Sequence, residues 1–470
     1  MNQNDTICAI ATAQGGAIGI IRVSGNKAID ITSDIFKPIK GLSLTERKPY
    51  TVTFGHIMSD TGEIIDEVLV SVFRAPHSYT GEDSVEISCH GSQYILQQII
   101  LRLIEKGCRG AQPGEYTQRA FLNGKMDLSQ ADAVADLIAS SSAASHRVAM
   151  NQMRGGFSKE ISTLRDKLLN LTSLLELEID FSDHEELEFA NRDELMDITN
   201  QIETATGRLV ASFKIGNAIK NGIPVAIIGE TNAGKSTLLN TLVGEERAIV
   251  SNIHGTTRDV IEDTANINDV IFRFMDTAGI RETDDVIENI GIERTFKTIK
   301  QSQIILWLID STKTYNADDA MTEQILNEAY EKEIIIVCNK TDISSPENLQ
   351  STDAFINGIK SKYAVSLYSI HISAKNNLNI DKLKQLMITA ANIPAISHND
   401  IIITNIRHYE ALSSALNSIR RVKEGLKTAL PSDLISQDLR ECIHHLSDIT
   451  GEINTDITLE NIFKNFCIGK

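Results

Sequence analysis

One short segment constrains the fold of this chain more than any other, the run Gly229–Ser236 with the sequence Gly-Glu-Thr-Asn-Ala-Gly-Lys-Ser. The apolar, β-branched run Pro224–Ile228 precedes it and predicts a buried parallel strand, and the residues from Thr237 onward are typical of a helix. A strand, a G-x-x-x-x-G-K-S loop and a helix together form a cradle for phosphate groups. Its glycines turn backbone N–H groups inward, the helix N-terminus adds positive charge, Lys235 reaches the outer phosphates, and Ser236 can bind Mg²⁺.

A second motif, Asp276-Thr277-Ala278-Gly279, follows the strand-like run Val270–Met275. A carboxylate at the end of that strand can hold Mg²⁺ through water, and the N–H of Gly279 can sense the γ-phosphate. The segment Gly255–Asp259 lies between this motif and the phosphate loop, where a mobile switch segment belongs. Within that segment, Thr257 is the natural second hydroxyl ligand of Mg²⁺.

Two more motifs indicate which base is bound. Asn339-Lys340-Thr341-Asp342 ends the predicted strand Ile334–Cys338, and the Asp342 carboxylate can accept both the ring N–H and the exocyclic amine of guanine. Adenine cannot satisfy that pairing, and a site built on such hydrogen bonds rejects the wrong base strongly. Ser373-Ala374-Lys375 follows another strand-like run and completes the pocket. Four motifs in the right order, at strand ends, predict a GTP-binding domain.

The residue that follows Asp-Thr-Ala-Gly is Ile280, where many small GTPases have a Gln that orients the attacking water. An apolar side chain cannot orient water or stabilise charge, so other groups must do so. The candidates to orient water are the acidic residues after the motif: Glu282, Asp284, Asp285 and Glu288. The candidate cations are Arg258, Arg281 and a K⁺ ion held by the side-chain oxygen of Asn232.

Composition sets limits on the class of protein. At 470 residues the chain is too long for one ordinary core, so two to four domains are expected. No apolar run reaches the length of a membrane span, no export signal is visible, and the six cysteines form no metal-binding spacing, which together predict a cytoplasmic protein. The net charge of −18 argues against a broad basic surface that binds nucleic acid alone, although a local patch or a basic partner could still bring it in.

The pattern along the chain predicts a multidomain α+β protein. Residues 1–122 have strand-like runs at 18–23, 51–57, 67–73 and 84–88 and a helical pattern at 92–106, which predict an α+β domain. Residues 123–221 are almost wholly helical in pattern, with one apolar stripe formed by Leu164, Leu168, Leu171, Leu175 and Ile179. Strands and helices alternate over 222–392 as in a doubly wound α/β domain, and 393–470 is helical again. The economical arrangement is an insertion, in which the flanking helices form one bundle that carries the α/β module between them.

Taken together, these motifs resemble the MnmE/TrmE family of tRNA modification GTPases over nearly the whole chain. The GTPase motifs are shared with many families, whereas Gly-Glu-Tyr-Thr-x-Arg-Ala-Phe-Leu-Asn and the closing Cys-x-Gly-Lys are specific to this one. The segments that carry the resemblance are Asp5–Ile7, Gly19–Gly25, Pro113–Lys125, Gly255–Asp259, Ile290–Glu293 and Cys467–Lys470.

The resemblance implies a homodimer whose G domains pair across their switch faces with K⁺ in the site. The family's K⁺ ligands correspond here to Asn232, Ser251, Ile253 and Thr256, and its water-orienting carboxylate to Glu288. With K⁺ supplying charge stabilisation, this assignment fills the gap left by Ile280. The residues implied to contact GTP are Asn232, Ala233, Gly234, Lys235, Ser236, Thr237, Ser251, Asn252, Ile253, His254, Gly255, Thr256, Thr257, Asp276, Thr277, Ala278, Gly279, Asn339, Lys340, Asp342, Ser373, Ala374 and Lys375.

The resemblance further implies that residues 1–122 bind a 5-formyl-tetrahydrofolate or a related folate. The folate-contacting positions would be Arg22, Glu82, Lys125 and Lys470, of which Arg22 and Lys470 suit an anionic glutamyl tail and Glu82 suits the pterin. Cys467 is either a functional thiol near that folate site or a small buried hydrophobe. His254 stands where the family commonly has a small residue, and either tunes the switch or has no role.

As an enzyme of this family, the chain is expected to be a K⁺-stimulated GTP hydrolase that uses Mg²⁺, with Lys235, Glu288 and Cys467 as catalytic candidates. With an FAD- and NADH-dependent partner of the MnmG/GidA type, it would install an aminomethyl or carboxymethylaminomethyl group at C5 of the wobble uridine, position 34 of tRNA. A heterotetramer with that partner is implied. The alternative is a non-catalytic GTPase switch in ribosome assembly or membrane remodelling, which shares every G-domain motif.

Overall fold

The structure of the protein is a computed structural model, and it divides into two compact units made of several segments. It describes residues 5–13, 15–180, 192–244, 263–275, 288–315, 319–363, 367–393, 400–452 and 469, with only the backbone of 177–180 and 288–294. The first unit comprises Met1–Ala135, Gln152–Glu203 and Ser414–Lys470, and the second comprises Asp136–Asn151 and Thr204–Ser413. The unit boundaries therefore run through the region predicted to be a helical domain, and the predicted domain limits stay a prediction.

A seven-stranded sheet with three helices forms the N-terminal part of the first unit. The strands are β1 (Ile7–Ile10), β2 (Ile18–Ser24), β3 (Phe36–Pro38), β4 (Thr51–Met58), β5 (Ile64–Phe73), β6 (Ser84–His90) and β7 (Arg109–Gly110), in the spatial order β3-β4-β5-β6-β2-β1-β7. The helices are α1 (Ala28–Ile35), α2 (Gln93–Glu105) and α3 (Glu115–Leu122), with a 3-10 turn η1 (Leu44–Glu46). The strands predicted at 18–23, 51–57 and 84–88 are confirmed, and β5 begins three residues before the predicted start at Glu67 because Ile64 pairs with Met58 across the turn.

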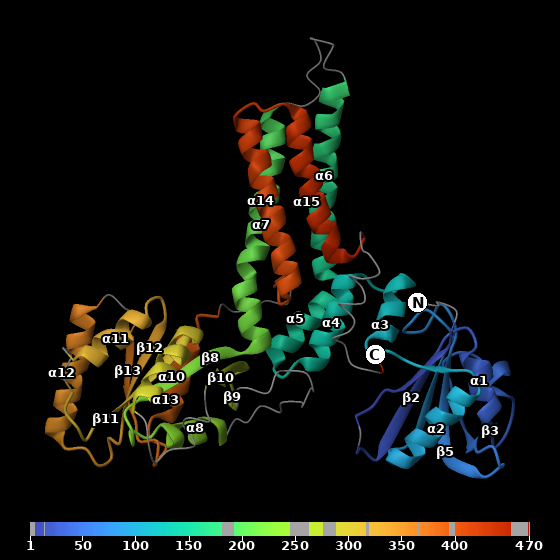
Figure 1. Ribbon diagram of the computed structural model, residues 1–470, viewed down its shortest axis with the longest axis horizontal. Coiled ribbons are helices and arrows are strands. Elements are labelled where there is room, and N and C mark those ends of the chain that lie inside the picture. The colour runs from blue at the N-terminus through green and yellow to red at the C-terminus, as the bar shows by residue number, and fades with distance from the viewer. Residues whose placement is uncertain are drawn as a thin grey trace. The chain divides into compact units, whose positions relative to one another are not determined.

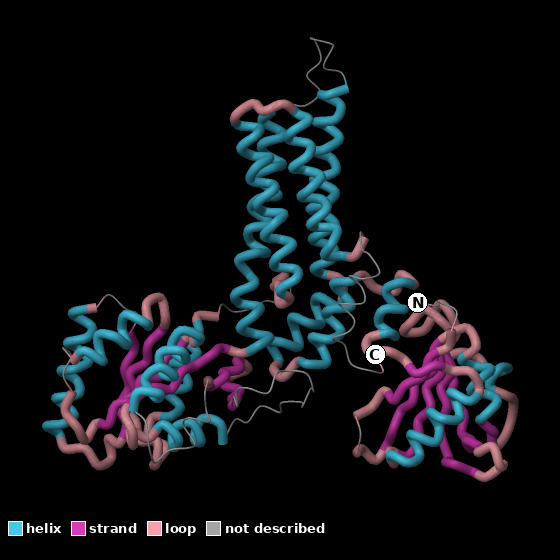
Figure 2. Tube along the Cα trace, viewed as in Figure 1, coloured by secondary structure: helices cyan, strands magenta, loops and turns pink. Residues whose placement is uncertain are grey.

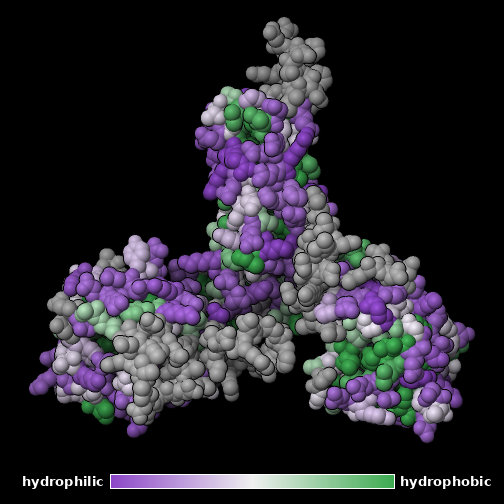
Figure 3. All heavy atoms as spheres, viewed as in Figure 1, coloured by the Kyte–Doolittle hydropathy of each residue, from purple (hydrophilic) through white to green (hydrophobic). Residues whose placement is uncertain are grey.

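The two faces of this sheet differ. Helices α1 and α2 cover one face, where Ile21, Val70 and Ile87 pack against Ile31 and Ile99 in a buried core. On strands β4 and β5 the alternation of side chains leaves apolar residues on the other face, listed here with their exposed fractions: Val52 62%, Phe54 47% and Leu69 47%. Hydrophobic residues also gather on the face of this domain seen in Figure 3, whereas the helical bundle seen there is largely hydrophilic.

Helices make up the rest of the first unit (Figure 1). They are α4 (Leu128–Ala139), α5 (Ala143–Met153), α6 (Gly156–Asp180), α7 (Arg192–Asn221), α14 (Ile406–Lys427) and α15 (Ser432–Thr450), of which α4, α5, α7 and α14 continue into the second unit. The predicted apolar stripe of α6 is confirmed, since Leu164, Leu168, Leu171 and Leu175 are all buried. Glu203 of α7 binds Arg420 and Lys423 of α14, so helices before and after the α/β module lie side by side here.

The α/β module of the second unit is built on a six-stranded sheet with helices on both faces (Figure 2). Its strands are β8 (Ile223–Gly229), β9 (Asp263–Ile267), β10 (Val270–Phe274), β11 (Ile304–Asp310), β12 (Glu333–Asn339) and β13 (Leu367–His371), in the order β13-β12-β11-β8-β10-β9. The helices are α8 (Lys235–Gly244), α10 (Glu288–Gln301), α11 (Ala320–Glu328), α12 (Pro346–Lys362) and α13 (Ile380–Ala391). All strand pairs are parallel except β9 with β10.

Strand β11 shows why its sequence is an unbroken apolar run. Ile304, Leu306 and Leu308 face the core formed with α8 and α13, whereas Ile305 and Trp307 face the core formed with α10, α11 and α12. A parallel strand covered on both faces has no solvent side to carry polar residues. The predicted doubly wound arrangement is therefore confirmed for this module.

The two ends of the module are joined within the second unit. Asp136 of α4 binds the Lys220 ammonium at 2.7 Å, just before β8, and accepts a hydrogen bond from the Thr404 hydroxyl at 2.9 Å, just before α14. Gly216 of α7 lies so close to the exit segment that a Cβ there would be 1.9 Å from the Ile403 carbonyl oxygen. These contacts agree with a module inserted between helices.

Among the described residues, no helix has the length and apolar character to cross a membrane.

Candidate functional site

The phosphate loop leaves strand β8 in a conformation that its sequence dictates. Gly229 has a φ of 147° and Gly234 a φ of 101°, a region that side chains other than glycine rarely adopt. A Cβ on Gly229 would lie 2.3 Å from the Leu308 carbonyl oxygen, and one on Gly234 would lie 2.3 Å from Nδ2 of Asn339. The loop therefore packs directly against strand β11 and against the guanine motif, which positions its backbone N–H groups.

One buried side chain connects three of the predicted motifs. Asn339, 3% exposed at the end of β12, donates from Nδ2 to the Ala233 carbonyl in the phosphate loop at 2.8 Å. Its Oδ1 accepts the backbone N–H of Ala374 at 3.0 Å, in the Ser373-Ala374-Lys375 motif. Because β8, β12 and β13 are parallel, their carboxyl ends meet at one edge, which is where ligands bind in open α/β sheets.

The residues predicted to read guanine lie beside this connection. The Asp342 side chain is exposed and accepts a hydrogen bond from Nδ2 of Asn376 at 3.0 Å, so its carboxylate is oriented from the Ala374 side. The Thr341 hydroxyl donates to the Ile372 carbonyl at 2.9 Å and holds the two loops together. Lys340 has a φ of 65°, a left-handed conformation that turns the chain sharply between Asn339 and Asp342.

Lys235 begins helix α8 and folds over the phosphate loop. Its ammonium donates to the carbonyl oxygens of Gly229 at 2.7 Å and Glu230 at 2.9 Å. Burial lowers the pKa of Lys235, and the Glu230 carboxylate offsets this only in part. Carbonyl oxygens thus hold the ammonium at the mouth of the loop, where phosphate oxygens of a bound nucleotide would replace them as stronger, charged acceptors.

Other predicted site residues can be placed only in part. Ser236 is half-buried in the first turn of α8, and Thr237 and Asn232 are exposed. Glu288 is the first residue of α10, of which the backbone alone is described there. The remaining predicted residues lie outside the described part of the chain: Ser251, Asn252, Ile253, His254, Gly255, Thr256, Thr257, Asp276, Thr277, Ala278, Gly279, Cys467 and Lys470.

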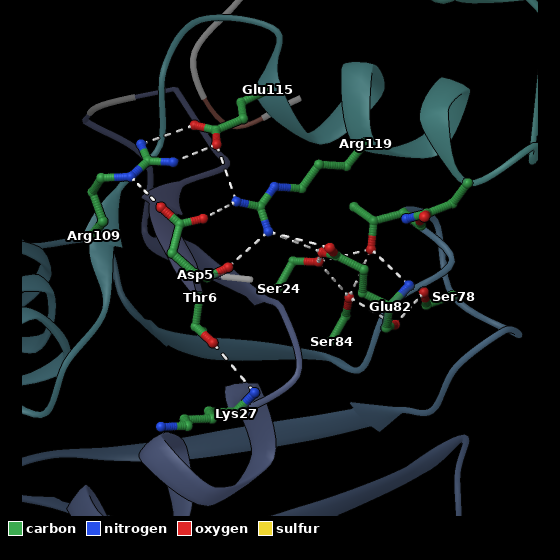
Figure 4. Close-up of polar contacts among 12 residues, drawn as sticks. Asp5, Thr6, Ser24, Lys27, Ser78, Glu82, Ser84, Arg109, Glu115 and Arg119 are labelled. Carbon is green, nitrogen blue, oxygen red and sulfur yellow. Dashed lines mark hydrogen bonds and ion pairs between the residues drawn. The ribbon is translucent and has the colours of Figure 1, made fainter. Parts of the chain in front are cut away.

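A second candidate site is a charged network in the N-terminal domain (Figure 4). Arg119 of α3 points between three carboxylates and binds Asp5 at 2.6 Å, Glu115 at 3.1 Å and Glu82 at 3.2 Å. Arg109 of β7 binds Glu115 at 2.5 Å and Asp5 at 2.7 Å from the other side. The network therefore ties the start of β1 to β7, to α3 and to the loop before β6.

Charge pairing determines the ionisation of this network. Burial opposes ionisation of Asp5, but hydrogen bonds from Arg109 and Arg119 outweigh it and lower the pKa of that carboxyl below its ordinary 3.8. The pKa of Glu115 is likewise raised by burial and lowered more by Arg109 and by the backbone N–H of Gln112, to a net value below 4.5. Both carboxylates are thus charged at neutral pH.

Two of the predicted folate residues, Glu82 and Lys125, lie at the loop from Ser78 to Asp83. Glu82 accepts hydrogen bonds from the Ser24 hydroxyl at 2.8 Å and from Arg119 at 3.2 Å. Lys125 donates to the Pro76 carbonyl at 3.0 Å, and its stem packs against Gly81.

Arg22, another predicted folate residue, contacts Gly469 near the C-terminus. Its guanidinium lies over the rings of Tyr79 and Tyr116, at 5.4 and 5.7 Å from the ring centroids, and pairs with Glu86 at 2.8 Å. It also donates to the carbonyl of Gly469 at 3.3 Å. Gly469, which lies between the predicted Cys467 and Lys470 in the sequence, therefore contacts the N-terminal domain.

Comparison with known proteins decides the family. The family description "GTP-binding protein TrmE N-terminus" matches residues 6–125, and "MnmE helical domain" matches residues 128–467. A tRNA modification GTPase MnmE of Bacteroides thetaiotaomicron is 61% identical over 471 residues, covering 100% of both chains. The chain belongs to the MnmE family.

Other members of the MnmE family are similar over the same span. The MnmE proteins of Phocaeicola vulgatus and Christiangramia forsetii are 59% and 52% identical, each covering 100% of both chains. Among solved structures, an Era variant of Aquifex aeolicus bound to GDP and AlF4⁻ matches at 30% identity with a TM-score of 0.27. That match covers 41% of this chain and 65% of the other, and a TM-score so low supports no argument about the fold.

Sequence reasoning assigned no role to several residues of these sites. Asp5, Glu115 and Arg119 stood within the segments that resemble the MnmE family, but only the fold showed that they form one network. Asp310, the last residue of β11, contacts Lys340, and Lys313, which follows the strand, contacts Glu230. A single carboxylate at the end of an otherwise apolar strand was the available signal for Asp310.

No group of three or more His, Cys, Asp or Glu among the described residues is arranged to hold a metal ion.

We expect Arg119→Met to destabilise the N-terminal domain by about 3 kcal/mol at pH 7, because it leaves Glu82 without its arginine and takes one of two cations from the carboxylates of Asp5 and Glu115. Asp5 and Glu115 have lower pKa values in the folded chain than in the unfolded chain. Their contribution to the free energy of unfolding is therefore fully present above the unfolded pKa values and is lost as pH falls through the folded pKa values. The difference between wild type and variant should therefore shrink from pH 5 towards pH 3.

Urea-dependent hydrogen exchange of peptides from β1 and α3 measures this local stability. Arg440→Met is the matched control, since it removes the Glu176 ion pair of a side chain that is 71% exposed and should have little effect at any pH. If Arg119→Met lowered the local stability by the same amount at every pH, this result would contradict the proposed ionisation of Asp5 and Glu115.

Proposed function

We propose that this chain hydrolyses GTP and takes part in tRNA modification, the activity for which its MnmE relatives are named. One observation supports the GTP site most directly: the buried Asn339 side chain joins the phosphate loop to the Ala374 loop beside Asp342. Phosphates at the helix N-terminus and a guanine at Asp342 then fit one nucleotide laid across the strand ends. Ser236 and Thr257 would hold Mg²⁺, which neutralises developing charge on the phosphates.

For hydrolysis we propose K⁺ in the role that an arginine has in other GTPases. The phosphate loop suits this, since Asn232 is exposed there with a φ of 64° and offers an oxygen beside the phosphates. Ser251, Ile253 and Thr256 would complete the ligand set. K⁺ would supply charge stabilisation, Glu288 would orient the attacking water, and Lys235 would bind the phosphates.

GTP turnover should be several-fold faster in KCl than in NaCl at equal ionic strength, because Na⁺ is too small for the same oxygen ligands. Asn232→Ala should remove the difference between the two salts while leaving binding of GDP intact. The measurement is phosphate release at saturating GTP. Equal rates in both salts for the wild-type chain would rule out this role of K⁺.

Glu288→Ala should lower GTP turnover by about a hundredfold or more without loss of nucleotide affinity, because the carboxylate acts on water rather than on the nucleotide. In cells whose only copy carries this variant, mass spectrometry of tRNA nucleosides should show loss of the modified wobble uridine. Glu328→Gln on α11, which loses only an ion pair with Lys300, is the control. Normal turnover in Glu288→Ala would assign the water-orienting role to another residue.

We further propose that the N-terminal domain binds a 5-formyl-tetrahydrofolate or a related folate. The donor set fits a heteroaromatic ring with an anionic tail: the half-buried Tyr79 offers an aromatic ring, Glu82 a carboxylate, and Lys125 a cation. Arg22 is already paired with Glu86 and Gly469. Lys125 and Lys470 would therefore bind more of the negative charge on the folate's glutamyl tail. The folate would supply a one-carbon unit. Cys467 would lie near this site, because it is close in sequence to Gly469, whose carbonyl Arg22 binds.

Fluorescence or calorimetric titration of the whole chain with 5-formyl-tetrahydrofolate should show binding that Lys125→Met weakens about tenfold, as expected for one lost charge contact to a carboxylate. Lys27→Met, a lysine of the same domain outside this residue set, is the control. Absence of folate binding to the wild-type chain would remove the folate from the proposal and leave the GTPase intact.

The proposed assembly is a homodimer that works in the cytoplasm with an FAD- and NADH-dependent partner of the MnmG/GidA type. Val52, Phe54 and Leu69 support the dimer, since exposed apolar residues on one open sheet face favour burial against another chain. Together the two proteins would add the aminomethyl or carboxymethylaminomethyl group at C5 of the wobble uridine. The negative charge of −18 suits a protein that leaves much of the contact with tRNA to its partner.

A further inference from the structure

The turn that follows strand β11 contacts both ends of the proposed nucleotide site. Lys313 pairs with Glu230 of the phosphate loop at 2.8 Å. On the other side, the backbone N–H of Ser311 donates to the Asn339 carbonyl at 3.0 Å, and the amide of Asn348 donates to the Thr312 carbonyl at 2.9 Å. Strand β11 lies between the strands that carry the phosphate loop and the guanine motif, so this turn lies between those two motifs.

Asp310, the last residue of β11, is a buried charged residue at the start of this turn. Its side chain is 6% exposed, and its Oδ2 binds the Lys340 ammonium at 2.7 Å. The other oxygen, Oδ1, accepts the backbone N–H of Thr312 at 3.0 Å and the Thr312 hydroxyl at 2.7 Å. Burial raises the pKa of Asp310, but the hydrogen bonds from Lys340 and Thr312 outweigh it and lower the pKa on balance. The carboxylate is therefore a fixed negative charge with a single orientation.

The direction of the Lys340 side chain follows from the sheet order. Lys340 comes directly after β12, where Asn339 is level with Asp310 of β11, and Leu308 of β11 is level with Gly229 of β8. A side chain that runs from Lys340 to Asp310 therefore extends from the guanine motif towards the phosphate loop. A nucleotide with phosphates at the loop and its base at Asp342 must cross this side chain.

We propose that Asp310 is a positioning residue of the guanine site, which holds Lys340 extended so that its hydrocarbon stem forms one face of the base pocket. Lysine stems bury their methylenes against apolar surfaces while the charged end is held elsewhere, and here Asp310 holds it. Without Asp310 the ammonium would be drawn to the phosphates beside Lys235, and the stem would leave the base. The proposal rests on the proposed GTP site and adds a residue that contacts no part of the nucleotide.

The test separates binding of the base from binding of the phosphates. Titration of the full chain with a fluorescent GDP should show about tenfold weaker binding for Asp310→Asn, the loss expected for one charge-assisted hydrogen bond. Competition by inorganic tripolyphosphate, which has no base, should be unchanged. The KM for GTP should rise in proportion, with kcat at saturation unchanged. Asp353→Asn on α12, which alters a contact with His371 of β13, is the matched control in the same module.

A double-mutant cycle tests whether Asp310 acts through Lys340. Lys340→Met keeps the stem and removes the ammonium, so Asp310→Asn combined with Lys340→Met should bind GDP no more weakly than Lys340→Met alone. Losses that multiply in the double variant would overturn the proposal. So would an equal loss of GDP and tripolyphosphate binding, or normal GDP binding by Asp310→Asn.

A milder variant covers the case in which Asp310→Asn does not fold, as judged by thermal unfolding. Thr312→Val removes the hydroxyl that orients the carboxylate but keeps the charge, and should weaken GDP binding about threefold with no effect on tripolyphosphate. No effect on GDP binding in this variant would count against the positioning role. If the wild-type chain itself bound no guanine nucleotide, the proposed function would fail, whereas wild-type binding with an unaffected Asp310→Asn would remove this inference alone.

Discussion

The hydrogen bonds of one buried amide, Asn339, join the loops that form the proposed nucleotide site. Its two ends bond to the phosphate loop and to the loop that carries Ala374, and each bond lies where water cannot replace it. A buried amide that lost one of these partners would carry the desolvation penalty of an unpaired polar group. The geometry of the phosphate cradle and of the base pocket therefore depends on the same residue, and the two cannot form separately.

The parallel sheet makes this connection possible. Strands β8, β11, β12 and β13 run in one direction, so the loops at their carboxyl ends are neighbours although they are far apart in the chain. Gly229 and Gly234 allow the loop to approach β11 and Asn339 more closely than any side chain would permit. Between these loops, Asp310 and Lys340 add an ion pair at the point where the ribose and base of a nucleotide would lie.

The N-terminal domain uses charge in a different way. Arg119 and Arg109 neutralise three carboxylates that come from the start of β1, from α3 and from the loop before β6. Bringing such charges out of water is costly, and the cost is offset only when every partner is in place. The network thus favours one arrangement of these segments, which is the arrangement that brings Arg22, Glu82 and Lys125 around one loop. The Gly469 carbonyl on Arg22 adds the far end of the chain to the same place.

The sequence by itself determined the strands and helices whose pattern is strong, the order of the GTPase motifs and the family. Apolar runs such as Ile304–Ile309 and glycines at fixed spacing are local signals, because they reflect the burial and backbone conformation of neighbouring residues. Only the tertiary structure decided that Asp310 binds Lys340, that Arg119 serves three carboxylates, and that Asp136 joins both ends of the α/β module. Apart from Arg119 and Glu115, which are four residues apart on α3, those contacts join residues 30 to more than 260 positions apart, and no local pattern encodes which distant charge a side chain will meet.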